Sequence, residues 1–224
     1  MVKKDLRTER KLRRLEENKI AIIQAAEKIF AQKGYTLTGM DDIAEEAQFS
    51  KATLYRYFKS KSEIFLEIIF RSFEESKKNM MVIQKESMSA EDKLKEVISY
   101  IISYYRKKQN IARIFMLEKG SMIKILRSGT EEKLPHASLH PRIPANFKTK
   151  MEEISRIIRE IIQEGIDNGE FRNVDAQDAS VVFGAMLRGF YFRGPVRIKE
   201  YSKSDITELL HGFFLYGIKK NTRA

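Results

Sequence analysis

Residues 38–58 contain two short amphipathic segments separated by a tight turn, and this arrangement constrains the fold more than any other feature. The first segment is predicted to begin near Gly39 or Met40, and it has carboxylates in its first turn, where they suit the positive end of a helix dipole. Gln48 lies in the turn, and Ser50 is a natural N-cap for the second segment. Two helices joined by about 3–4 residues are typical of the helix-turn-helix unit, whose second helix enters the major groove of DNA.

The second of these helices is predicted to present a polar outer face. At about 100° per residue, Leu54 and Phe58 fall on the side that points into the domain, whereas Ala52 and Arg56 point outward. Small apolar groups, hydroxyls and a cation suit DNA, because arginine reads guanine and small apolar groups meet the thymine methyl. Taken alone, these residues are equally compatible with an ordinary polar surface helix.

Residues 25–65 resemble the N-terminal domain of the tetracycline-repressor (TetR) family. The matching features are Ala26, Phe30, Gly34-Tyr35, Thr38, Ile43-Ala44, Ala47, Ser50-Lys51, Leu54-Tyr55, Tyr57-Phe58 and Lys61. The resemblance implies an all-α chain, in which a three-helix helix-turn-helix domain precedes a variable helical domain that binds a small ligand and dimerises. Gln48 departs from the family pattern, which usually has glycine there, and Gly39 replaces the capping Ser or Thr. A non-glycine residue at a left-handed turn position costs about 1 kcal/mol, which the fold tolerates.

We therefore predict two domains, with residues 1–62 forming an N-terminal arm and the DNA-binding domain, and residues 63–224 forming the effector-binding and dimerisation domain. The net charge of +11 favours polyanionic partners, and the first segment is about twice as basic per residue as the second. The predicted contacts with double-stranded DNA are Thr38, Gly39, Met40, Ser50, Lys51, Ala52, Thr53, Tyr55, Arg56, Tyr57 and Lys61.

The first 17 residues are dense in charge and show little apolar periodicity. They are interpreted either as a flexible or frayed helical extension, or as an arm that reaches phosphates or the minor groove. The first regular helix is predicted over residues 18–33, with Gly34 as its C-cap signal. Residues 60–63 form a capping box at the start of a long helix, which links the two domains in the TetR family.

The remainder of the chain shows the periodicity of amphipathic helices. Ser89 and Ser204 are predicted to cap two of them. Residues 127–146 contain three of the four prolines and cannot form one regular helix. A loop of that length is either a ligand-entry lid or a disordered excursion.

Residues 181–192 are apolar around nearly the whole circumference of a helix, which implies burial on all sides. One face is therefore expected in the core and another against a second subunit. Members of the TetR family commonly dimerise through their last two long helices, and plain core packing is the alternative. The predicted contacts of a homodimer are Phe183, Leu187, Phe190, Leu210, Phe213 and Phe214. Such a dimer reads a palindromic operator whose half-sites lie about 34–36 Å apart or multiples of that.

The resemblance places the pocket for a small-molecule effector between the linking helix and the helices that follow it. Candidates by residue type and position are Phe65, Ile69, Tyr100, Tyr104, Phe115, Met116, Phe147 and Met186. Aromatic residues and methionines at helical spacing are also typical of ordinary core. Their apolar character favours a hydrophobic effector, such as a lipid-like or aromatic compound.

Catalytic and metal-binding motifs find little support in the sequence. The chain has three histidines and no cysteine, which excludes thiolate metal sites and disulfides. His136 and His140 are four residues apart but have no clear third ligand, so we predict no metal, no cofactor and no catalytic residue. His211 is interpreted as a packing or interface residue.

The N-terminus lacks an apolar signal segment and no run approaches 18 apolar residues, so we expect a cytoplasmic protein without membrane contact. The sequence predicts a DNA-binding transcription regulator rather than an enzyme, in the form of a homodimeric repressor released from its operator by a small apolar ligand. Two alternatives stay open: an architectural DNA-binding protein with little sequence preference, and a small-molecule-binding or metal-dependent helical enzyme.

Overall fold

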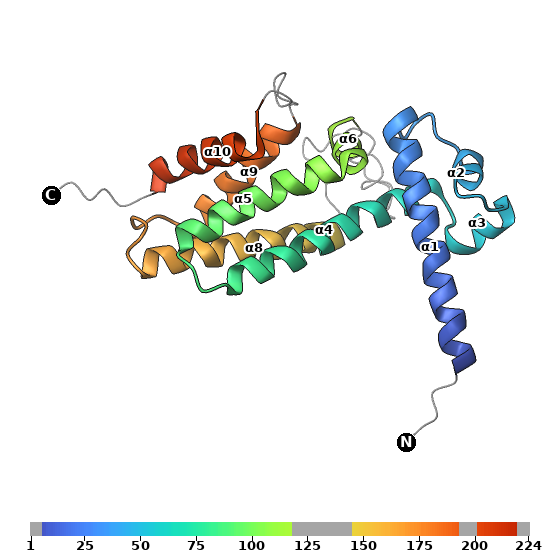
Figure 1. Cartoon of the computed structure of the whole chain (residues 1–224), viewed down its shortest axis with the longest axis horizontal. Helices are drawn as coiled ribbons and strands as arrows, with labels where there is room; N and C mark the ends of the chain where they lie inside the picture. The colour runs from blue at the N-terminus through green and yellow to red at the C-terminus, as the bar shows by residue number, and fades with distance from the viewer. Residues whose placement is uncertain (1–5, 118–144, 193–200, 219–224) are drawn as a thin grey trace, which may run out of the picture.

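The computed structural model describes residues 6–117, 145–192 and 201–218, and the regular elements of this part are α-helices (Figure 1). In chain order they are α1 (Leu6–Lys33), α2 (Met40–Glu46), α3 (Lys51–Tyr57), α4 (Lys61–Lys85), α5 (Ala90–Lys107), α6 (Gln109–Leu117), α8 (Ala145–Asp167), α9 (Ala176–Phe192) and α10 (Lys203–Ile218). The predicted all-α fold class is confirmed. Figure 1 places α1, α2 and α3 at one end of an elongated bundle formed by the other helices.

The first helix is longer than predicted, since α1 begins at Leu6 and not near residue 18. Its N-terminal half has no apolar stripe, so the helix is held by charged pairs instead. Arg13 pairs with Glu17 one turn away at 3.7 Å, and Glu16 accepts a hydrogen bond from Arg71 of α4 at 2.7 Å. The second contact joins residues far apart in the sequence, which is why periodicity could not reveal it.

The boundaries of the helix-turn-helix agree with the prediction. Gly39 is the N-cap of α2, and the carboxylate of Asp42 accepts a hydrogen bond from the Gly39 N–H at 2.8 Å. Gln48 adopts the left-handed conformation with φ of 57°, so the turn keeps its geometry without the glycine that is usual in the family. The hydroxyl of Ser50 accepts a hydrogen bond from the Thr53 N–H at 3.1 Å and caps α3.

The later caps follow the prediction with two differences. Ser60 accepts a hydrogen bond from the Glu63 N–H, but Glu63 in turn accepts from the N–H of Lys59 and not from Ser60. Ser89 caps α5 as predicted. For α10 the prediction of Ser204 is wrong, because Ser202 and Asp205 exchange side-chain hydrogen bonds with each other's N–H groups at 3.0 and 2.8 Å. The carboxylate three residues after Ser202 decides between the two serines.

Two clusters of buried apolar side chains form the core. The N-terminal cluster joins α1, α2 and α3 to the first half of α4, and it continues into α5, α6 and α8. The C-terminal cluster joins α5, α8, α9 and α10. Because Ile64 and Ile68 of α4 belong to the N-terminal cluster, the packing passes across the predicted domain boundary at residue 62, and that boundary stays a prediction.

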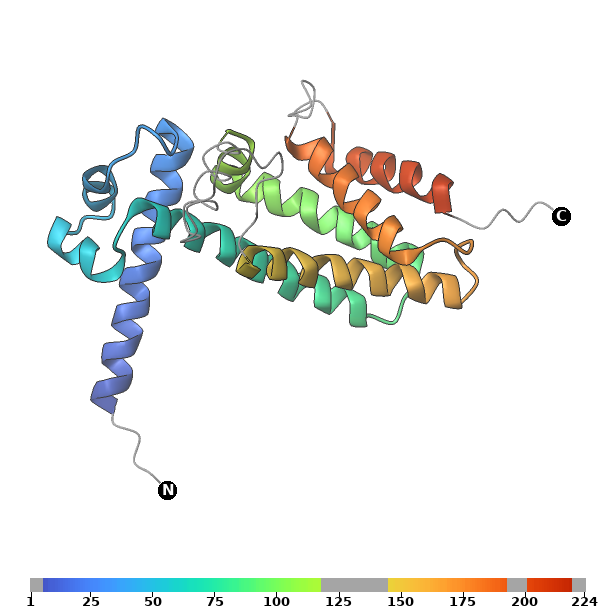
Figure 2. The same ribbon diagram turned by 180° about the vertical axis from the view of Figure 1, so that it is seen from behind.

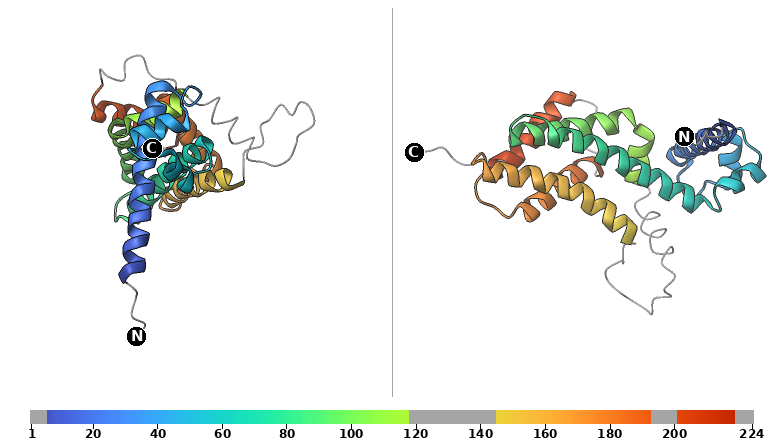
Figure 3. Two further views of the ribbon diagram at one scale, coloured as in Figure 1. Left: turned by 90° about the vertical axis from the view of Figure 1, so that its right-hand side faces the viewer. Right: turned by 90° about the horizontal axis from the view of Figure 1, so that it is seen from below.

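The arrangement of the bundle positions the DNA-binding end. From behind, α8 runs along α4, while α10 packs on α5 (Figure 2). The right-hand view of Figure 3 looks nearly along α1, so this helix runs across the length of the bundle. In the part of the chain that the structure describes, no helix combines the length and apolar character that a membrane span requires.

Candidate nucleic-acid interface and effector region

The outer face of α3 is built as its periodicity predicted. Leu54 and Phe58 are buried in the N-terminal cluster, which fixes the rotation of the helix about its own axis. Ala52, Tyr55 and Arg56 are exposed on the opposite side, and they form a short surface with a methyl group, a phenol and a guanidinium. These groups match base edges and phosphates in a major groove.

Ion pairs surround the start of α3. Lys51 lies 2.8 Å from a carboxylate oxygen of Asp41 in α2, and its hydrogen bond to Asp41 raises the pKa of the lysine. A hydrogen bond from Lys33, together with the N–H of Gly39, lowers the pKa of Asp42. Both carboxylates in the first turn of α2 therefore have cationic partners, which reduces their repulsion of an approaching phosphate.

Thr38 and Lys61, two of the predicted DNA contacts, use their polar groups inside the protein. The buried hydroxyl of Thr38 donates to the carbonyl of Gly34 at 2.7 Å. The half-buried ammonium of Lys61 donates to the carbonyls of Tyr35, Thr36 and Thr38 at 2.8, 3.2 and 2.7 Å. The hydrogen bonds of Lys61 therefore connect the loop between α1 and α2 to the start of α4.

The remaining predicted DNA contacts lie around the same surface. Gly39 and Ser50 are exposed at the starts of α2 and α3, while Met40 is half-buried. Tyr57 is half-buried as well, and its hydroxyl accepts a hydrogen bond from the amide of Asn18 in α1 at 2.9 Å. Sequence reasoning missed Asn18, because a contact between positions so far apart leaves no periodic signal.

Four of the predicted effector contacts belong to one buried cluster. Phe65, Ile69, Tyr104 and Phe147 all belong to the N-terminal cluster and are buried. The hydroxyl of Tyr104 donates to Ser72 at 3.2 Å, and burial raises the pKa of Tyr104.

The other candidates are more dispersed. Tyr100 is half-buried and packs against both clusters, whereas Met186 packs against the C-terminal one. Phe115 and Met116 belong to α6, but their side chains lie outside the described part. Tyr105, which was not among the candidates, lies beside Tyr104 with ring centroids 5.6 Å apart, and burial raises its pKa to about 12.

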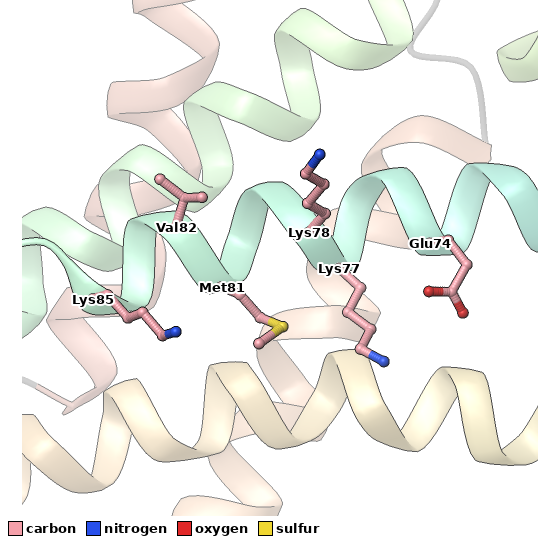
Figure 4. A pocket seen from close by; sticks show the side chains of 6 residues that line it. All are labelled: Glu74, Lys77, Lys78, Met81, Val82 and Lys85. Atoms are coloured by element: carbon pink, nitrogen blue, oxygen red, sulfur yellow. The ribbon is translucent and has the colours of Figure 1, made fainter. Parts of the chain in front are cut away.

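A shallow groove of about 300 Å³ follows the outer side of α4 (Figure 4). All its lining residues come from this one helix, namely Glu74, Lys77, Lys78, Met81, Val82 and Lys85. Lys77, one of these residues, pairs with Glu153 of α8 at 2.8 Å. The groove is a surface feature, distinct from the buried cluster that holds the predicted effector contacts.

The predicted dimer contacts divide between core and surface. Phe183, Leu187, Leu210 and Phe214 are buried within their own protomer, and Phe190 is half-buried. Phe213 is 72% exposed. Exposed apolar residues of α9 and α10 outside the predicted set are Val181, Val182, Leu209 and Tyr216. A groove of about 640 Å³ between α9 and α10 contains Val182 and Phe213 in its wall.

Some predicted features lie outside the described residues. These are His136, His140 and the proline-rich stretch up to residue 144. His211 is buried in α10, with its ring nitrogen 3.2 Å from the carbonyl of Glu91, in keeping with a packing role.

Three helices at one end of the molecule, of which α2 and α3 are joined by a tight turn and α3 presents an exposed polar face, are the arrangement of a helix-turn-helix DNA-binding protein. The family described as "Bacterial regulatory proteins, tetR family" matches residues 22–68. The uncharacterised HTH-type transcriptional regulator YhgD of Bacillus subtilis is 26% identical over 92% of this chain and 98% of its own length. The HTH-type transcriptional repressor NicS of Pseudomonas putida is 25% identical over 84% of this chain and 81% of its own length.

The fold is also found among solved structures. The transcriptional regulator FadR of Bacillus subtilis, solved in complex with stearoyl-CoA, matches with a TM-score of 0.71 at 23% identity, over 88% of this chain and 98% of that one. The DNA-binding end of the chain, over residues 22–68, is therefore that of the TetR family of helix-turn-helix transcriptional regulators. This family consists of DNA-binding regulators and not of enzymes, in agreement with the sequence prediction.

Proposed function

We propose that the protein is a homodimeric repressor, which leaves a palindromic operator when a small molecule with an apolar part binds among the helices that follow the DNA-binding end. The observation that carries the proposal is the N-terminal cluster. In it, Leu54 of α3 and Ile22 of α1 share one buried core with Tyr104 of α5, Ile114 of α6 and Phe147 of α8. A ligand that displaces side chains at one end of this close-packed cluster shifts the helices at the other end.

The exposed face of α3 supports the DNA-binding part of the proposal. Arg56 projects from a helix whose position is fixed by the buried Leu54 and by the Ser50 cap. A guanidinium held in this way can form two hydrogen bonds with a guanine. The predicted contacts Thr53 and Tyr55 flank it and are assigned to the same surface.

The exposed apolar residues of α9 and α10 support the dimer. Leu209, Phe213 and Tyr216 follow one another along one side of α10, and Val181 and Val182 lie on α9. A contiguous apolar surface of this kind marks a protein interface. Gly212 and Gly217 have open space where a side chain would stand, which allows a second chain to approach closely. The proposed interface therefore keeps Phe213 and Phe190 from the prediction and adds the exposed residues.

The effector is proposed to carry a long acyl chain as a coenzyme A thioester. NicS is a repressor, and FadR of Bacillus subtilis was solved in complex with stearoyl-CoA. In this chain the candidate residues Phe65, Ile69 and Phe147 belong to one buried apolar cluster, whose character suits an acyl chain. Tyr104 belongs to the same cluster and adds a polar group, because its phenol donates a hydrogen bond to the hydroxyl of Ser72.

The DNA-binding part is tested with labelled duplex from upstream of the protein's own reading frame, at near-physiological salt and against scrambled competitor. Arg56→Ala is expected to weaken operator binding by about 1–3 kcal/mol. Arg156→Ala, which removes an exposed arginine of α8, is the matched control and is expected to bind as the wild type does. Equal binding of the wild type to operator and scrambled duplex would favour an architectural protein instead.

The ligand response is tested on the same complex by adding stearoyl-CoA or coenzyme A alone. Release by stearoyl-CoA and not by coenzyme A would support an acyl-chain effector. Phe147→Trp is expected to raise the stearoyl-CoA concentration needed for release, because the larger ring occupies buried space, and release is compared at equal occupancy of the operator. A complex that persists at saturating stearoyl-CoA would reject this effector class.

A further inference from the structure

The N-terminal half of α1 is a straight helical extension with one strongly basic side. It projects beyond α3 and away from the other described helices (Figure 1). Arg10, Lys11 and Arg14 on it are exposed, and within the described part of the chain they form no ion pair. Arg7, one turn earlier, lies on the same side by helical periodicity.

The direction of this basic side follows from the contact made by Asn18. At about 100° per residue, Lys11, Arg14 and Asn18 fall within about 60° of the helix circumference, and Arg10 borders Arg14. The amide of Asn18 donates to the hydroxyl of Tyr57 at the end of α3. The basic side therefore continues the side of α1 that contacts Tyr57 at the end of the recognition helix.

Two acidic residues of this half of α1 are occupied elsewhere. Glu16 accepts a hydrogen bond from Arg71 of α4, and Glu17 pairs with Arg13. Arg71 also binds Glu67, which pairs with Lys19 at 3.0 Å. This chain of ion pairs attaches the extension to α4 on one side and leaves the side of Arg10, Lys11 and Arg14 positive.

Like charges at these spacings oppose helix formation in the free protein. Arg10 and Arg14 are four residues apart, and Lys11 and Arg14 are three apart, so each pair lies within one turn. A polyanion bound along this side attracts all three cations, and this attraction offsets the repulsion among them. From Arg10 to Asn18 the side extends about 12 Å, which is long enough to face several phosphates of one DNA strand.

We propose that the basic side of the α1 extension, formed by Arg10, Lys11 and Arg14, is a second DNA-contact surface that binds phosphates outside the reach of α3. The inference rests on the proposed function, since it requires that α3 docks on DNA. Phosphate contacts position a protein without reading sequence, so this surface adds affinity and salt dependence but no base preference. It also assigns a role to the basic N-terminal segment that the helix-turn-helix leaves unexplained.

The test compares the full chain with Arg10→Gln/Lys11→Gln/Arg14→Gln on a 40-base-pair duplex enriched from a random pool by the wild-type protein. Lys78→Gln/Lys85→Gln/Lys148→Gln is the matched control, because it removes the same charge from positions of α4 and α8 away from the extension. Glutamine is a good helix former, and circular dichroism checks that α1 persists. Arg13→Gln, which changes another side of the extension, is a second control.

The triple variant of the extension is expected to bind the duplex at least about tenfold more weakly. The slope of its log affinity against log salt is expected to be less negative by about 0.9 for each phosphate that the variant no longer neutralises. Its preference for the enriched duplex over scrambled DNA is expected to stay unchanged. Ethylation interference should show phosphates that matter for the wild type and for the control but not for the variant.

Two other outcomes are distinguishable. If the variant matches the control in affinity, salt slope and interference pattern, the extension is a solvated helix and the inference is wrong, while the proposed function stands. If the wild type enriches no duplex from the pool, the proposed function itself fails.

Discussion

Gln48 shows how one residue can depart from a family pattern without changing the turn. Its φ of 57° is a conformation that glycine adopts freely and other residues adopt with strain. Gln48→Gly removes about 1 kcal/mol of strain from the folded state. It also stabilises the unfolded chain by about 0.4–1 kcal/mol, because glycine gives that chain more conformational entropy. We expect a free energy of unfolding within about 1 kcal/mol of the wild type, measured by urea denaturation.

Gln48→Val separates backbone strain from side-chain chemistry at the same position. A β-branched residue is a true outlier in the left-handed region, so we expect the free energy of unfolding to fall by about 1–3 kcal/mol. If the valine variant is as stable as the glycine variant, the turn has rearranged and the conformation at Gln48 is not required.

Lys61 is a second residue whose role differs between sequence and structure. The family pattern implies a phosphate contact, whereas the ammonium donates to three carbonyls of the loop after α1. Lys61→Ala leaves these carbonyls without their charged donor, so we expect the free energy of unfolding to fall by about 1–3 kcal/mol. Lys59→Ala, an exposed neighbour, should change it by less than about 0.5 kcal/mol.

The salt dependence of operator binding by Lys61→Ala separates the two roles of Lys61. A phosphate contact by Lys61 would appear as a lower salt slope of operator binding with unchanged stability. The opposite result, a lower melting temperature with an unchanged salt slope, is what its hydrogen bonds predict.

At the scale of helices, α8 and α5 depend on a close approach at Gly165. A Cβ at this position would stand 2.3 Å from the ring of Phe171, which follows in the loop, and 2.9 Å from the Cβ of Ala90. We expect Gly165→Ala to destabilise the protein by about 1–3 kcal/mol through overpacking, although alanine favours helix. Thermal unfolding measures the change, and Asp167→Ala at an exposed position of α8 is the control. An alanine variant as stable as the wild type would mean that Phe171 can move aside.

Helical periodicity predicted those elements whose apolar residues face a single core. The faces of α3 were predicted correctly because Leu54 and Phe58 are separated by one turn and both reach the core. The regular part of α1 was predicted to start only at residue 18, with a frayed helical extension or an arm before it, because the N-terminal half makes ion pairs instead of apolar contacts, including one between Glu16 and a residue of α4. Contacts of this kind are set by tertiary structure and have no local signature.

For α9 and α10 the sequence could not separate the two apolar sides. Both helices carry apolar residues all round, so periodicity gives no preferred direction. Phe183 and Phe214 pack against each other in the core, with ring centroids 4.9 Å apart, whereas Phe213 next to Phe214 points outward. Only the packing of α5 and α8 around them decides which phenylalanine is buried.

At the scale of the whole molecule, the outward side of α10 is where a second protomer is proposed to bind. Phe213 and Tyr216 are 72% and 94% exposed, so a charge placed there disturbs little within the protomer. We expect Phe213→Asp to give monomers in sedimentation velocity at micromolar concentration, with helix content unchanged, because a carboxylate at the centre of an apolar interface loses its hydration. The monomer should also bind a full palindromic operator far more weakly, since it engages one half-site at a time. Leu37→Asp, which changes an apolar residue of similar exposure near α2, should remain dimeric. A Phe213→Asp variant that sediments as a dimer would place the interface on another surface, and the apolar side of α10 would then need a different partner.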